Sequence, residues 1–293
     1  TRHSTLFPYT TLFRSDILSV LQFGVLSLVI LPILPNRDFG PYSALNPQHI
    51  WWMVVLISGI SLAGYAALRL VGTRHGAILL GIFGGLVSST ATTIIFSRHA
   101  RQKAALVPVA GVVVLLATLV VMLRIGFVVL LIAPPLIAPM AGILGSGLVL
   151  GLLAAGWVWR QQHHDGNEAL PMPEISNPTE IKTALTFGGF YALILVLSAW
   201  LKDIADSQGL YLLALISGLT DVDAISLSAL RLFDSAQLGA NQAVTTLVLA
   251  LLSNLVFKTG IIMVLGGNAL ARRTWFGMLA VAIGLIIGLL YFV

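Results

Sequence analysis

The stretch that decides the fold is Ile216–Ser228, ISGLTDVDAISLS, because it places two carboxylates, Asp221 and Asp223, inside an otherwise apolar segment. A weaker copy, GGLVSSTATT, occupies Gly84–Thr93. Both copies read Gly-Leu and then a short polar run with alanine at the same place. We infer two broken helices that form one polar site within a bilayer.

The composition is that of a membrane protein. Of the 293 residues, 58% are hydrophobic and 9% are charged, whereas a soluble domain carries roughly 25% charged residues. The chain has no cysteine, which excludes disulfides and thiolate metal sites. The formal net charge is +5. Because no Lys/Arg-rich block accompanies this charge, it indicates membrane topology and not a nucleic-acid partner.

The N-terminus is set apart from the rest. Thr5–Ser15, TLFPYTTLFRS, looks like the translation of a sequencing-adapter oligonucleotide, so we expect residues 1–15 to be an artefact. The native chain would then resume near Asp16, with an N-terminal portion lost. A genuine amphipathic start is the alternative.

Apolar stretches predict an all-α, polytopic membrane protein, since a spanning helix needs roughly 20 mainly apolar residues. We expect about seven spanning helices, at 17–34, 49–71, 104–133, 136–159, 180–201, 242–265 and 269–293. Two broken segments lie at 76–97 and 210–233. Residues 16–35 would form an extra transmembrane helix before two membrane repeats, 48–160 and 179–293, with a linker loop at 161–178.

Two landmarks recur at nearly the same offset. Gly85 and Gly218 lie 133 residues apart, and Arg124 and Lys258 lie 134 apart. Two independent landmarks at one offset indicate an internal duplication. Glycine-interrupted apolar segments at corresponding places in two halves point to a transporter site.

The broken segments either cross the bilayer or re-enter on one side. Twelve Lys/Arg residues remain when Arg2, Arg14, Arg124 and Lys258 are set aside, and crossing divides them 5 to 7 between the two sides of the membrane. Re-entry places three on one side, which are Arg37, Lys202 and Arg231. The other nine then lie on the opposite side: Arg69, Arg74, Arg98, Arg101, Lys103, Arg160, Lys182, Arg272 and Arg273. The positive-inside rule favours re-entry, which also inverts the second half relative to the first. Both segments are nevertheless long enough to cross.

Glycines are the expected cause of the breaks. Gly84, Gly85 and Gly218 permit backbone angles that interrupt a helix. The carbonyls and amides freed in this way would become ligands.

The two acids are the central candidates. An aspartate at membrane depth costs roughly 2.5–3.5 kcal/mol on an insertion scale, so Asp221 and Asp223 indicate either function or a specific partner. With the Thr220 hydroxyl they would form an oxygen site for a hard cation, and they are the candidate metal ligands. Alternatively, Thr220 and Asp223 form a capping box that only seals a half-helix.

Further candidates lie on neighbouring segments. The hydroxyls of the first segment would coordinate a cation, hold an anion together with helix amides, or merely pack and bond back to carbonyls: Ser88, Ser89, Thr90, Thr92 and Thr93. Lys258 is a natural partner for either aspartate, whereas Arg124 has no acid in its own half and would point across the pseudo-symmetry axis. Snorkelling of both bases is the alternative. Asn254, one turn before Lys258, would face the same side and add a ligand.

The motifs GGLVSSTATTIIFSR and SGLTDVDAISLSALRL, each followed by a helix that carries a basic residue, resemble those of a known family. The chain is similar to the C-terminal membrane domain of MgtC/SapB-type proteins, a domain of unknown function (DUF4010), over about Pro47–Val293. Members often carry an MgtC-like module before this domain, and its absence here agrees with the expected truncation. The family name implies magnesium physiology, but the resemblance does not by itself imply a transport activity.

These features predict a secondary transporter or ion-coupled permease for a cation such as Mg²⁺, Na⁺ or H⁺. We expect it in the bacterial inner membrane, with the lipid bilayer and a small ion or solute as partners, and we leave a homo-oligomer open. The alternative is a non-transporting membrane regulator or subunit in which the polar residues are structural. We expect neither an enzyme nor a cofactor, since no catalytic or nucleotide-binding motif is found.

Overall fold

The computed structural model describes residues 17–71, 76–160 and 181–293. The expected artefact at 1–15 and the linker at 161–178 lie outside these ranges. The described residues are almost all helical, and six of their helical stretches are long and apolar enough to cross a membrane. Large apolar side chains such as Leu28, Val256 and Leu290 are exposed on the outside, as contact with lipid requires. The all-α, polytopic membrane fold is therefore confirmed.

The N-terminal part lies beside α3. Residues 17–33 form a short apolar helix that includes the π-helical turn η1 (Val25–Ile30) and α2 (Leu31–Ile33). A loop with the 3₁₀ turn η2 (Pro41–Ser43) leads to α3 (Pro47–Val71). The indole N–H of Trp51 donates to the carbonyl of Leu26 at 2.9 Å and ties the two helices together.

The centre of the bundle is α5 (Val107–Ile132), with 78% of its most apolar window buried. It follows α4 (Gly76–Gln102) and the 3₁₀ turn η4 (Ala104–Leu106), and it leads through η5 (Pro134–Leu136) to α6 (Ile137–Arg160). A helix that is apolar all round is expected to be buried among other helices.

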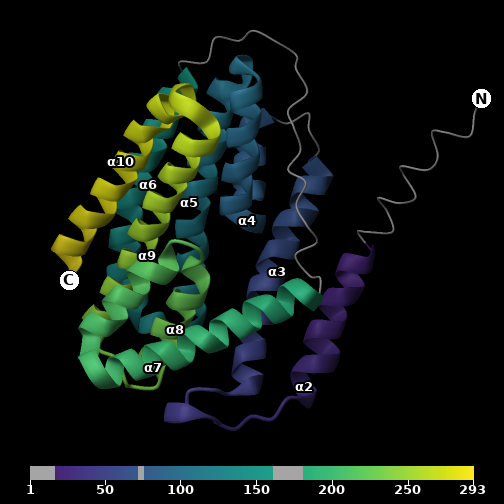
Figure 1. The fold of residues 1–293 in the computed structure, drawn as a ribbon, viewed down its shortest axis with the longest axis vertical. Coiled ribbons are helices and arrows are strands. Elements are labelled where there is room, and N and C mark those ends of the chain that lie inside the picture. The colour runs from purple at the N-terminus through teal and green to yellow at the C-terminus, as the bar shows by residue number, and fades with distance from the viewer. Residues whose placement is uncertain (1–16, 72–75, 161–180) are drawn as a thin grey trace, which may run out of the picture.

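The second half contains α7 (Ile181–Gly218), α8 (Val222–Asp234), α9 (Ala240–Ile261), the π-helical turn η6 (Ile262–Gly266) and α10 (Gly267–Phe292). Gly267, with φ of 74°, makes the turn between α9 and α10. Figure 1 shows α7 running across the lower end of the bundle, at a large angle to α5 and α6.

Helix α4 folds back on itself at Ser88. This residue has extended backbone angles (φ −164°, ψ 105°) inside the helix. A Cβ atom placed on Gly84 would lie 2.8 Å from Oγ1 of Thr92, whereas residues eight apart in a straight helix are separated by about 12 Å. The two arms therefore form a hairpin, which lies in the upper half of the bundle in Figure 1. This is the re-entrant shape that the charge distribution predicts.

The second broken segment has the same shape. A Cβ atom on Gly209 would lie 2.6 Å from the carbonyl oxygen of Leu201, so α7 bends there and leaves Gln208–Gly218 as a short apolar arm. Neither this arm nor the 13-residue α8 reaches the roughly 20 residues that a crossing needs. Just after α8, Ser235 lines a cavity together with Ala199 of α7, so the end of this segment lies near the first part of α7. It lies in the lower half in Figure 1.

The same close contact occurs once in each half. A Cβ atom on Gly85 would lie 2.7 Å from Cα of Ala117 in α5, and one on Gly218 would lie 2.8 Å from Cα of Ala250 in α9. Both members of the first contact are 133 residues before their counterparts in the second. Two hairpins that enter from opposite ends are what an inverted duplication produces. The exact repeat boundaries stay a prediction.

Gly218 is the last residue of α7, but neither it nor Gly84 nor Gly85 interrupts its helix through a positive φ. Among the described glycines only Gly40 and Gly267 have positive φ, and the extended residue follows three positions after Gly85 and Gly218. Glycine is needed at these two positions because a neighbouring helix backbone leaves no room for a side chain. Gly84 plays a similar part within the α4 hairpin, where it faces Thr92.

Candidate functional site

The tips of the two hairpins face one cavity of about 210 Å³. A water molecule occupies roughly 30 Å³ in the liquid, so the cavity has room for an ion with several waters. The first tip contributes mainly hydroxyls and the second contributes carboxylates: Val87, Ser88, Ser89 and Thr90, and Thr220, Asp221, Val222 and Asp223. Helices α3, α5 and α9 complete the wall with Ile57 and Ser61, with Val121 and Arg124, and with Asn254. Eight of the eleven predicted binding residues line this cavity.

The second tip is shaped by Asp221. Its backbone is extended (φ −146°, ψ 112°), and its Oδ1 accepts the backbone N–H of Asp223 at 2.8 Å. This is the N-cap arrangement that aspartate favours. The alternative of a capping box from Thr220 to Asp223 is wrong, because the turn before α8 gives the cap position to Asp221. The Thr220 hydroxyl instead donates to the carbonyl of Ser217 at 3.2 Å.

The first tip uses Ser88 in the same way. Ser88 Oγ accepts the backbone N–H of Ala91 at 3.3 Å, and its backbone angles are close to those of Asp221. The two residues lie 133 positions apart, the offset of the duplicated contact. One tip therefore has a neutral cap and the other a charged cap at equivalent positions.

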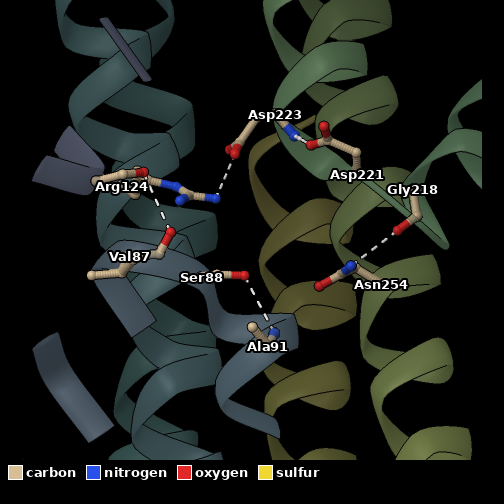
Figure 2. Close-up of polar contacts among 9 residues, drawn as sticks. Val87, Ser88, Ala91, Arg124, Gly218, Asp221, Asp223 and Asn254 are labelled. Carbon is tan, nitrogen blue, oxygen red and sulfur yellow. Dashed lines mark hydrogen bonds and ion pairs between the residues drawn. The ribbon is translucent and has the colours of Figure 1, made fainter. Parts of the chain in front are cut away.

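An ion pair joins the two halves across the cavity. Arg124 on α5 donates from Nη2 to Oδ2 of Asp223 on α8 at 2.5 Å, and each side chain is 9% exposed. Figure 2 shows the two side chains pointing toward each other. Arg124 thus reaches across the pseudo-symmetry axis, as the lack of an acid in its own half predicts. Among the described residues, Asp223 Oδ1 and Arg124 Nε are buried without a hydrogen-bond partner. A buried unpaired carboxylate oxygen is costly, so this geometry favours an additional group in the cavity.

The carbonyls freed at the breaks have partners. Asn254 on α9 donates from Nδ2 to the carbonyl of Gly218 at 3.1 Å (Figure 2), and the Ser61 hydroxyl on α3 donates to the carbonyl of Val87 at 3.3 Å. Broken helices in a membrane need such replacement partners. Asn254 therefore supports the tip as well as lining the cavity. Ser61 was not predicted, and a lone serine in an apolar helix gives no strong signal.

Three predicted residues do not line the cavity. Thr93 donates from its hydroxyl to the carbonyl of Ser89 at 2.8 Å, and Thr92 is buried against Gly84. Both side chains are packed inside the hairpin, which matches the packing alternative. Lys258 is 1% exposed on α9, and the charges of Arg124 and Asp223 act on it. Such burial rules out snorkelling for Lys258, while its pairing with an aspartate stays a prediction.

The cavity has few strong metal ligands. Asp221 and Asp223 are the two carboxylates among its described lining residues. In the described part of the chain, no three His, Asp or Glu side chains are grouped closely enough to hold a metal ion. Any cation bound here would therefore rely on two carboxylates and on neutral oxygens from the hydroxyls and Asn254.

Comparison with known proteins identifies one family. The domain of unknown function (DUF4010) matches residues 55–266. An uncharacterized protein of Aquifex aeolicus (strain VF5) is 33% identical over 193 residues, which make up 66% of this chain and 84% of that protein. No solved structure matches the chain significantly. The expected relation to MgtC/SapB-type proteins stays a prediction.

Proposed function

This chain belongs to the DUF4010 family, and from that premise we propose that it is a secondary transporter or ion-coupled permease. The transported cation would bind between the tips of the α4 and α7–α8 hairpins. One observation carries the proposal: a tip from each half reaches the same cavity, where Asp221, Asp223 and Arg124 bring charge into the interior of an apolar bundle. Charged residues at such depth are expensive and usually mark ion or substrate pathways.

The arrangement of the halves fits alternating access. Hairpins that enter from opposite ends offer each side of the membrane its own gate to a shared central site. The Arg124–Asp223 pair links these halves directly. A cation that binds Asp223 weakens the attraction between this carboxylate and Arg124. Occupation of the site is then coupled to the relative position of the halves, since a ligand shifts a conformational equilibrium only by binding its states differently.

Flux into proteoliposomes tests the proposal. Asp221→Asn and Asp223→Asn should each abolish cation uptake, because each removes a carboxylate from the cavity. Asp234→Asn is the matched control: Asp234 lies on the same helix, but its side chain is 53% exposed, and it should keep wild-type flux. Wild-type flux in both cavity variants, with folding intact, would remove the proposal.

A non-transporting membrane regulator or subunit is the second candidate. The observation in its favour is the same Arg124–Asp223 pair, which would hold the halves together without any ligand. This reading predicts no flux of any cation in the wild-type protein.

We further propose that the chain is not an enzyme, because the described cavity residues contain no nucleophile–base pair of the kind that covalent catalysis uses. A bacterial inner membrane as its location and a homo-oligomer belong to the same proposal.

A further inference from the structure

We propose that the cavity binds a monovalent metal cation, with Na⁺ as the type case, and selects against Mg²⁺ and other divalent cations. The ion would lie at the α8 tip, between Asp221 and the free oxygen of Asp223. This inference rests on the proposed function for its biological meaning. It is nevertheless a statement about binding, which can be measured without transport.

The first argument is the charge of the cavity. Two carboxylates line it, but Oδ2 of Asp223 is already paired with Arg124 at 2.5 Å. The described lining is thus left with a formal charge of −1. Lys258 is buried on α9 within the electrostatic reach of Asp223. A net charge of −1 attracts a divalent ion only twice as strongly as a monovalent one, whereas a divalent ion such as Mg²⁺ gives up its hydration far more reluctantly, so a single net negative charge suits a monovalent ion better.

The second argument is the buried oxygen that has no partner. The Asp223 side chain is 9% exposed, it lines the cavity, and its Oδ1 has no hydrogen-bond partner among the described residues. Asp221 uses Oδ1 to cap α8, and it lines the same cavity. The unpartnered oxygen of Asp223 and the carboxylate of Asp221, together with neutral oxygens from the hydroxyls and Asn254, form a set of hard ligands. With a single net negative charge, this set matches Na⁺.

The third argument places the ion at one tip. A half-helix that begins at a break carries partial positive charge at its N-terminus, which repels a cation. At the α8 tip the Asp221 carboxylate offsets that charge, whereas at the α4 tip the equivalent cap is the neutral Ser88. The cation is therefore expected beside α8, and the α4 hydroxyls would supply neutral ligands from the opposite wall.

The equivalence of the caps provides a variant that should change selectivity. Ser88 has nearly the same extended backbone as Asp221, and aspartate is as good an N-cap as serine. Ser88→Asp should therefore fold, and it would add a third carboxylate to the cavity. Its formal charge would become −2, which favours a divalent ion. Ser88→Asn is the matched neutral control, since asparagine also caps helices but adds no charge.

Equilibrium binding to the purified protein in detergent tests the inference. Radioactive ²²Na⁺ should bind saturably to the wild type, one ion per chain, and an equal concentration of Mg²⁺ should not displace it. Asp221→Asn and Asp223→Asn should lose this binding. In Ser88→Asp, Mg²⁺ should displace ²²Na⁺ at least tenfold more effectively than in the wild type, whereas Ser88→Asn, which alters the same ligand without adding charge, should not show this gain for Mg²⁺ over Na⁺.

The outcomes separate this inference from the proposed function. Saturable Na⁺ binding without flux in proteoliposomes would refute transport and leave the monovalent site standing. Mg²⁺ flux, or Mg²⁺ binding that excludes Na⁺, would overturn the monovalent site and leave transport standing. Absence of saturable Na⁺ binding would also overturn it. If the aspartate variants fail to fold, the competition in the wild type and in Ser88→Asp still decides.

Discussion

Removing either member of the Arg124–Asp223 pair should destabilise the protein strongly, and removing both should cost less than the sum. Each side chain is 9% exposed, so Arg124→Gln or Asp223→Asn leaves the other charge buried and unpaired, which costs about 3–5 kcal/mol. A loss of 1 kcal/mol lowers Tm by about 2–4 °C in a protein of this order of size. The single variants should therefore lose about 6–20 °C. The double variant removes both charges of the pair, so the coupling energy should reach about 1–3 kcal/mol.

The assay is thermal unfolding of the four proteins in one detergent, followed by intrinsic fluorescence. The pair Arg231–Asp234 serves as the control cycle. Its atoms are 3.4 Å apart and its side chains are 34% and 53% exposed, so its coupling should stay below about 1 kcal/mol. If the Arg124–Asp223 cycle gives a coupling as small as that of the surface pair, the ion pair does not hold the two halves together, and the coupling step of the proposed transport fails with it.

Three further predictions follow from the hairpins and their packing. Because the chain has no cysteine, single cysteines introduced at the hairpin ends, at positions 78, 103, 208 and 234, can report topology. Re-entry predicts that a membrane-impermeant thiol reagent labels 78 and 103 from one side of the membrane and 208 and 234 from the other. Labelling of 78 and 103 from opposite sides would mean that α4 crosses. Gly218→Ala places a Cβ 2.6 Å from the carbonyl oxygen of Ala250 and should lower Tm by several degrees, while Gly156→Ala, with nothing within 4 Å, should leave Tm unchanged or raise it slightly; equal Tm values in the two variants would contradict the close approach of α9. Ser61→Ala removes the donor to the Val87 carbonyl and should cost about 0.5–1.5 kcal/mol in the same unfolding assay, and no measurable loss would mean that this carbonyl has another partner.

The meeting of acids and hydroxyls could be predicted from the sequence because of how a membrane treats polar groups. A polar run in the middle of an apolar segment cannot face lipid, so two such runs at matching positions are expected to face each other. The partner of Arg124 was predictable for a related reason. Its own half offers no acid within the membrane, so the nearest available carboxylate had to come from the other half, and Asp223 provides it.

Glycine alone did not identify the position of the breaks, because a glycine in a sequence has two possible roles. It permits positive φ, and it permits close approach of another backbone. Only the neighbours of Gly85 and Gly218 show that close approach is the relevant one. The break itself falls on Ser88 and Asp221, where a side-chain oxygen caps the next half-helix. Searching for capping residues in the middle of apolar segments would have found both positions.

The directions of Thr92 and Thr93 were beyond the sequence for a different reason. Helical periodicity relates residues only while the helix continues. One extended residue, Ser88, resets the angular position of everything after it, so the face that Thr93 presents cannot be counted from the arm before the break. Within the first broken segment, the residues predicted to line the cavity that do not are therefore Thr92 and Thr93, just beyond the tip. Ser88, Ser89 and Thr90, which belong to the tip itself, line the cavity as expected.

The predicted duplication would explain why one position has so much influence on the chemistry of the site. Ser88 and Asp221 occupy equivalent cap positions at the two tips, and aspartates at both would bring three carboxylates together with Asp223, a set typical of divalent cation sites. In this chain the bases recur in both halves, as Arg124 and Lys258, but the capping acid does not. The balance of charge is thereby shifted away from a divalent site by the choice of serine at position 88. Replacing that serine is consequently the smallest change that should alter which ion the cavity binds while leaving the fold of both hairpins intact.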